Sequence, residues 1–182
     1  MLTVISPGVN TSDFAPPRFK PAPDVYLKAA AHARAPPARC VAVEDSSSGA
    51  GSAANARIGL IVGYVGASHI AREHKASHAA TLLAGERADD GRGADVVIAD
   101  MRDLPALVAW FARGGAGAAP TRSSRGGAAT VVPREVLDAL EGQVWTRENV
   151  DASAQPKSPR SKQARVRFAD DVRAHLKTIR AA

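Results

Sequence analysis

The sequence predicts an α/β fold with a Rossmann-like, doubly wound parallel sheet flanked by helices. Three short segments, 40–43, 60–65 and 96–99, are apolar throughout, which is typical of strands buried on both faces. Segments with helical character separate them, and strands that alternate with helices indicate a parallel arrangement. Ligands of such sheets bind at the carboxyl ends of the strands, so the residues after each strand are the first candidates for a functional site.

The other elements follow in order along the chain. Residues 2–5 are a strand candidate, and a Pro-rich loop leads to a helix over 24–34 that begins at the favourable acid Asp24. Ser46 to Ser48 can cap a helix that runs to about residue 56. A third helix is predicted over 70–84, rich in Ala and His.

The last predicted helix spans 104–111, carries one apolar stripe, and has Asp103 as its predicted N-cap. Beyond it the composition changes to a Gly/Ala/Ser-rich linker and a basic, low-complexity tail that we expect to be disordered. We therefore divide the chain into a core, 1–113, and an extension, 114–182. The core holds 12 Lys/Arg and 11 Asp/Glu and the extension 12 and 7, so the net charge of +6 belongs mainly to the extension.

The amino-acid composition restricts the classes of protein to which this chain can belong. Cys40 is the only cysteine, which excludes an internal disulfide and favours the reducing cytoplasm. No run of about 18 apolar residues is present, so we expect no membrane span. The basic tail, 151–182, contains one aromatic residue, Phe168, and so offers no stacking series for a specific nucleic-acid partner.

Two adjacent acids, Glu44 and Asp45, directly follow the first core strand. Adjacent carboxylates in a cleft repel each other unless a cation joins them, and Mg²⁺ uses one or two protein carboxylates together with water and phosphate. Lys20 lies upstream in a turn stiffened by two prolines, and there it could serve as a point charge for a phosphate. The alternatives are a solvated acidic pair beside the next helix and an ordinary surface lysine.

Together the two motifs resemble the haloacid dehalogenase (HAD) superfamily, in particular its beta-phosphoglucomutase and sugar-phosphate phosphatase branch. The motifs read Lys-Pro-Ala-Pro-Asp at 20–24 and Val-Glu-Asp-Ser-Ser-Ser-Gly at 43–49, with one helix between them. The resemblance covers about residues 18–113 and corresponds to the C-terminal half of such a domain. It implies an Mg²⁺-dependent phosphatase of small phosphorylated metabolites, with Lys20 contacting nucleophile and phosphate and with Glu44 and Asp45 holding Mg²⁺.

One part of the family pattern has no counterpart in this sequence. The family nucleophile lies in an Asp-x-Asp motif on a strand upstream of the lysine, with a cap domain between, and no Asp-x-Asp occurs in the chain. Asp100 and Asp103 have the wrong spacing, and Ser6 lies too close to Lys20 to match the family's phosphate-binding Ser/Thr. The core therefore resembles a partial domain that lacks the nucleophile strand and the cap, and enzymatic activity stays open. The alternative is a truncated, non-catalytic binding module.

Three further sequence motifs have a functional interpretation. Residues 49–54 fit G-x-G-x-x-A, a dinucleotide fingerprint, but the intervening EDSSS and the two carboxylates oppose a pyrophosphate. His69, His74 and His78 could bind zinc, although exposed helix surface is the simpler interpretation. Residues 165–168 resemble the Arg-Val-x-Phe docking motif for protein phosphatase 1, which would make the chain a docking protein.

Overall fold

The computed structural model describes residues 18–115 and 130–150. The strand candidate 2–5, Ser6, most of the linker and the tail with its 165–168 motif lie outside the described residues. No helix in the described part of the chain is long and apolar enough to cross a bilayer. The described elements are, in order, α1 Asp24–His32, η2 Pro37–Arg39, β1 Val41–Glu44, α2 Ser47–Asn55, β2 Leu60–Tyr64, η3 Arg72–His74, α3 Lys75–Ala84, β3 Val96–Ile98, η4 Met101–Asp103, α4 Leu104–Trp110, η5 Phe111–Gly115, α5 Arg134–Leu137 and β4 Val144–Trp145.

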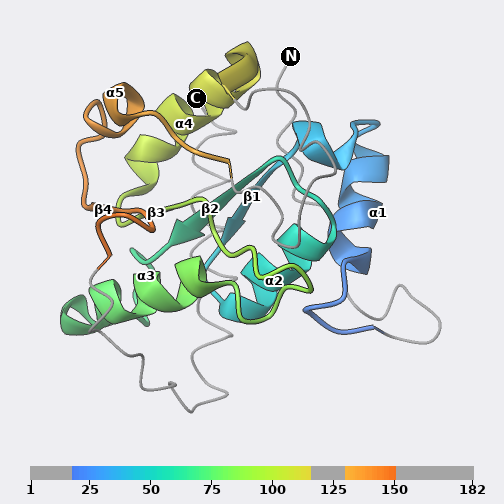
Figure 1. Ribbon diagram of the computed structural model, residues 1–182, viewed down its shortest axis with the longest axis horizontal. Coiled ribbons are helices and arrows are strands. Elements are labelled where there is room, and N and C mark those ends of the chain that lie inside the picture. Colours follow the sequence, from blue (N-terminus) through green and yellow to red (C-terminus); the bar gives the residue numbers. More distant parts are fainter. Residues whose placement is uncertain (1–17, 116–129, 151–182) are drawn as a thin grey trace.

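The sheet has the order β1-β2-β3-β4 (Figure 1). β1 pairs parallel with β2, and β2 pairs parallel with β3, with Val43 opposite Val62 and Val62 opposite Val96. The predicted α/β fold with parallel core strands is therefore confirmed. Because β1, β2 and β3 run in the same direction, their carboxyl ends lie at one rim of the sheet.

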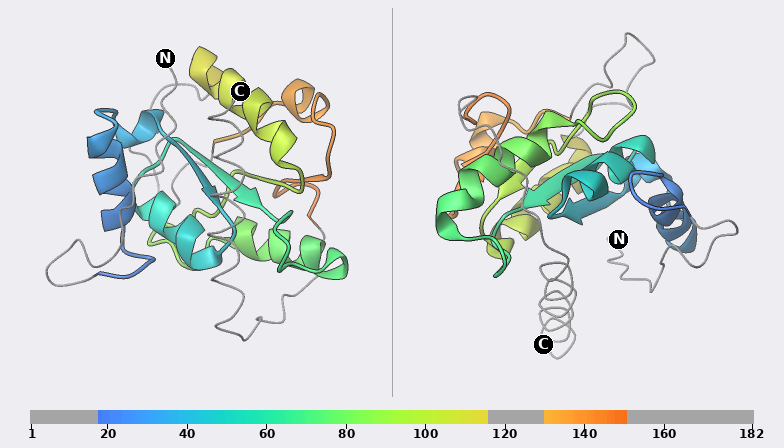
Figure 2. Two further views of the ribbon diagram at one scale, coloured as in Figure 1. Left: turned by 180° about the vertical axis from the view of Figure 1, so that it is seen from behind. Right: turned by 90° about the horizontal axis from the view of Figure 1, so that it is seen from below.

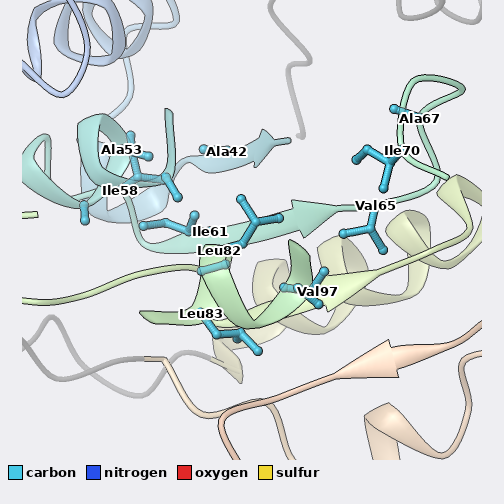
Figure 3. Packing of buried hydrophobic residues seen from close by; sticks show 14 of the residues in the cluster. Ala42, Ala53, Ile58, Ile61, Val65, Ala67, Ile70, Leu82, Leu83 and Val97 are labelled. Carbon is cyan, nitrogen blue, oxygen red and sulfur yellow. The ribbon is translucent and has the colours of Figure 1, made fainter. Parts of the chain in front are cut away.

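Helices cover both faces of the sheet, as the views in Figures 1 and 2 show. On one face, Ile61 and Val97 pack with side chains of α2 and α3, such as Leu82, in the cluster drawn in Figure 3. On the other face, Leu60 and Val62 pack with side chains of α4, such as Leu107. Successive residues of a strand point to opposite faces, so a sheet covered on both sides requires apolar residues at every position. This explains the uninterrupted apolar segments of the sequence.

Residues 130–150 pack on the core, although the sequence analysis placed all of 114–182 in an extension. β4 pairs antiparallel with β3, and Val132 is buried among the side chains of α4. Thr130 donates its backbone N–H to Asp95 Oδ1 over 2.9 Å and its hydroxyl to the Gly59 carbonyl over 2.7 Å. The described part of the core thus includes this segment, which covers β3 on the side away from β2.

A buried ion pair provides the acceptor for Thr130. Arg92 Nη2 lies 2.7 Å from Asp95 Oδ2, and the side chains are 7% and 0% exposed. The same aspartate oxygen accepts the Ile61 backbone N–H over 2.8 Å, and Arg92 donates to the carbonyl of Ile58 over 2.8 Å. This pair therefore joins β2, the start of β3 and the segment at Thr130 through side chains that are shielded from water.

The predicted capping role of Asp103 is wrong. Asp103 does occupy the position before α4, but its carboxylate makes no capping hydrogen bond there. It accepts the backbone N–H groups of Glu141 and Gly142, over 2.8 and 3.0 Å, and so holds the loop before β4. Asp100 caps the preceding turn by accepting from Arg102 N, and hydrogen bonds from Arg102 lower the pKa of Asp100 to about 2.

Candidate functional site

The three residues predicted from the motifs lie together at the carboxyl rim of the sheet. Glu44 is the last residue of β1 and Asp45 follows it. Lys20 comes from the turn before α1, and its Nζ contacts Glu44 Oε1 in an ion pair. The Lys20 side chain is 34% exposed and that of Glu44 is 8% exposed, so the pair is shielded on the carboxylate side and open on the amine side.

Two polar side chains of α2 hold the Lys20 turn in place. Ser52 donates its hydroxyl to the Ala22 carbonyl over 2.6 Å, and Asn55 donates its amide to the Pro21 carbonyl over 3.0 Å. Ser52 is fully buried although it is polar, and its hydrogen bond satisfies the hydroxyl. Because α2 begins just after Glu44 and Asp45, the helix that follows the carboxylates also fixes the lysine turn.

Tyr26 is a member of the site that the sequence analysis missed. Its hydroxyl, on α1, donates to Glu44 Oε1, and its ring lies 5.5 Å from Lys20 Nζ. Burial first, and then the negative charge of Glu44, raise the pKa of the Tyr26 hydroxyl well above its usual value. The hydroxyl therefore keeps its proton and acts as a donor to the carboxylate. The spacing of Tyr26 from Asp24, two residues on in the first turn of α1, offered no sequence pattern for this role.

The second oxygen of Glu44 lies over the start of α2. Ser46 caps α2 by accepting from Gly49 N over 3.1 Å, and its hydroxyl donates to Glu44 Oε2 over 3.4 Å. A Cβ atom on Gly49 would lie 1.7 Å from Glu44 Oε2, so only glycine leaves room for the carboxylate. Residues 49–54 are buried within α2, which makes them a packing surface and contradicts the dinucleotide-binding reading.

Two histidines contact Asp45. His69 follows β2 and places Nε2 3.4 Å from Asp45 Oδ2, and His78 of α3 donates from Nε2 to the Asp45 carbonyl over 2.6 Å. The expectation of exposed helix surface therefore fails for both, whereas His74 is exposed as expected. Burial and the charge of Glu44 raise the pKa of Asp45, and the two histidines act in the opposite direction.

The carboxylate oxygens of Glu44 and Asp45 are suitable ligands for a hard cation. Glu44 and Asp45 supply oxygen atoms only. Burial first, and then the negative charge of Glu44, raise the pKa of Asp45, and a divalent cation offsets this cost of keeping both carboxylates ionised. No group of three or more His, Cys, Asp or Glu in the described residues could hold a metal ion, so the histidines form no zinc site there. Two carboxylates leave most of a magnesium shell to water and phosphate, which is how proteins commonly bind Mg²⁺.

Replacing Tyr26 by phenylalanine is expected to lower the free energy of unfolding by about 1.5–3 kcal/mol, because the charged acceptor loses a donor in a place shielded from water. Urea unfolding followed by circular dichroism measures the change. In a Glu44→Gln background the same substitution should cost less, since the charge on the acceptor is gone. Equal costs in both backgrounds would contradict the hydrogen bond.

Comparisons with known proteins give one similarity. No protein-family model and no curated protein matches the chain. Among solved structures, the chain is similar to a conserved haloacid dehalogenase-like protein of unknown function from Agrobacterium tumefaciens, with 38% sequence identity and a TM-score of 0.48. The match covers 59% of this chain and 43% of that protein, so the chain spans less than half of its length.

Proposed function

We propose that this domain supplies the phosphate- and magnesium-binding side of a HAD-type phosphatase that acts on small phosphorylated metabolites. The observation that supports the proposal is the contact between Lys20 Nζ and Glu44 Oε1 next to Asp45. These residues come from separate motifs, 24 and 25 positions apart in the sequence, and a phosphate site needs its amine and its cation ligands within reach of one group.

In this proposal each side chain has one task. Lys20 turns its exposed side toward the phosphoryl group, while Tyr26 and Ser46 keep the Glu44 carboxylate oriented. Glu44 and Asp45 hold Mg²⁺, which when bound offsets the negative charge of the phosphoryl oxygens. Catalysis by such a site consists mainly of positioning and charge neutralisation, so the rigidity of the lysine turn and of the carboxylates matters more than their acid–base properties.

The nucleophile of the proposed reaction has no counterpart in the sequence, because no Asp-x-Asp occurs in these 182 residues. We therefore expect this chain by itself to bind Mg²⁺ and phosphate without turning over a phosphomonoester. The non-catalytic alternative from the sequence analysis predicts the same result for this chain, and a longer protein that contains the nucleophile would separate the two.

Isothermal titration with Mg²⁺, in the presence of inorganic phosphate, tests the proposal. The wild-type chain should bind Mg²⁺, and Asp45→Asn should weaken the affinity by about 100-fold because a ligand is lost. Lys20→Met should abolish the strengthening of Mg²⁺ binding by phosphate. Asp89→Asn, which changes an exposed acid of the loop after α3, is the matched control and should change nothing. A wild-type chain that binds no Mg²⁺ at millimolar concentration would refute the proposed metal site.

Hydrolysis of p-nitrophenyl phosphate provides the second measurement. We expect no Mg²⁺-dependent turnover by the wild-type chain. Turnover that disappears in a variant with both Glu44→Ala and Asp45→Ala would show that a nucleophile is present after all.

A further inference from the structure

We propose that His69 and His78 are positioning residues that together fix the orientation of the Asp45 carboxylate for cation binding. The proposal rests on the proposed function, in which Asp45 is a ligand of Mg²⁺. It assigns a task to two side chains that no motif at Lys20 or Glu44 includes. They reach Asp45 from two different elements, His69 from the segment after β2 and His78 from α3.

His78 fixes the backbone of Asp45. Its Nε2 donates to the Asp45 carbonyl over 2.6 Å, across 33 residues of sequence. Asp45 lies between the end of β1 and the cap of α2, where the chain leaves the sheet. A carbonyl at such a point has no strand partner, and a hydrogen bond from α3 sets its direction and hence the direction in which the side chain departs.

His69 acts on the carboxylate itself. Its Nε2 lies 3.4 Å from Asp45 Oδ2, and the two side chains are only 17% and 15% exposed. The backbone around His69 is anchored on both sides, because Val65, Ala67 and Ile70 are buried in the core cluster that Figure 3 shows. A well-anchored imidazole beside one carboxylate oxygen restricts the rotation of that group and leaves the other oxygen for a ligand.

Two other roles for this pair fail on the geometry. A zinc site needs a third ligand, and the described residues form no group of three or more metal-binding side chains. A proton-transfer role for His69 needs a ring nitrogen open to substrate, but Nε2 faces Asp45 and Nδ1 is buried. The contacts therefore favour orientation of Asp45 over direct chemistry.

Direct cation binding is the first test, with Mn²⁺ as the probe and the free ion measured by electron paramagnetic resonance. His69→Leu and His78→Leu are each expected to weaken Mn²⁺ binding by about tenfold, the lower end of the effect of groups that orient metal ligands. His69→Gln, whose amide nitrogen reaches the place of Nε2, should recover most of the affinity. His74→Leu is the matched control on the same segment, because His74 is exposed, and it should bind Mn²⁺ like the wild type.

The second test needs no metal and separates the two proposals. In ¹⁵N spectra of the metal-free chain, Asp45→Asn should shift the His69 Nε2 resonance and leave that of His74 unchanged. An unmoved His69 resonance overturns the positioning proposal, whatever the cation measurements give. If Asp45→Asn shifts the His69 resonance but the wild-type chain binds no Mn²⁺, the proposed metal site is overturned and the contact between His69 and Asp45 is supported.

The variants must also be folded. Thermal unfolding of each variant by circular dichroism identifies any that lose structure, and the Gln and Leu replacements at the same position then separate a lost donor from a lost fold. His69→Leu that is folded and binds Mn²⁺ as tightly as the wild type would overturn the proposal.

Discussion

Replacing Asp95 by alanine (Asp95→Ala) is expected to lower the free energy of unfolding by about 3–5 kcal/mol. Asp95 accepts from the Arg92 side chain and from the Ile61 backbone N–H in buried contacts, and from the Thr130 backbone N–H in a half-buried one. Removing the carboxylate leaves the Arg92 charge without its partner where water cannot replace it. Since domains of this size are stable by about 5–15 kcal/mol, the loss should be plain in urea or thermal unfolding.

The matched control for Asp95→Ala is Asp138→Ala. Asp138 also pairs with an arginine, Arg134, at 2.8 Å, but these side chains are 59% and 85% exposed. An exposed pair contributes about 0–1 kcal/mol, so Asp138→Ala should barely change the unfolding midpoint. Similar costs for the two substitutions would show that the network around Asp95 does not hold the core together.

Replacing Gly49 by alanine (Gly49→Ala) is expected to lower the free energy of unfolding by about 1–3 kcal/mol through overpacking. It should also displace the Glu44 carboxylate from its partners. The added Cβ would lie 1.7 Å from Glu44 Oε2, so the carboxylate must move away from Lys20 and Tyr26. Without this contact the same change within a helix would stabilise by about 0.5–1 kcal/mol, so the expected sign is opposite to that of helix propensity. Urea unfolding gives the stability change, and Mg²⁺ titration should show a loss of affinity.

A double variant provides the control for Gly49→Ala. In a Glu44→Ala background the atom that the new Cβ meets is absent, so Gly49→Ala should become neutral or slightly stabilising. A penalty that stays the same in that background would mean that Gly49 is needed for the backbone of α2 and not to make room for the carboxylate.

Prediction from the sequence succeeded where a pattern was continuous. The apolar segment 60–65 predicted a strand buried on both faces, which is β2, and β3 follows the same rule. In β1, at the edge of the described sheet, buried residues alternate with half-buried ones. Prediction failed for Val144–Trp145, because a strand of two residues has no periodicity to detect. The segment at Thr130 was missed for a similar reason: its polar contacts are single hydrogen bonds to residues 35 and 71 positions away.

For the candidate site, the residue types were predictable and their contacts were not. Lys20, Glu44 and Asp45 were predicted because their two motifs together resemble one superfamily and because the two acids directly follow a buried strand. Asp103 also carries a charge before a helix, but its carboxylate binds a loop that local rules cannot place. Tyr26 reaches the site through a tertiary contact with a residue 18 positions away, which the spacing of side chains along α1 does not reveal.

The two edge strands of the described sheet differ in how readily they can pair with a further strand. β4, at one margin, has two residues, and so short a strand is a poor template for another chain. β1, at the other margin, has four residues and pairs on one side only among the described elements, so its outer row of backbone donors and acceptors can bind a further strand. A strand added there in the parallel sense would end beside Glu44. Self-association through this margin would therefore place a second chain beside Glu44 and Asp45. Under the proposed function, such a dimer is expected to bind Mg²⁺ less well than the monomer.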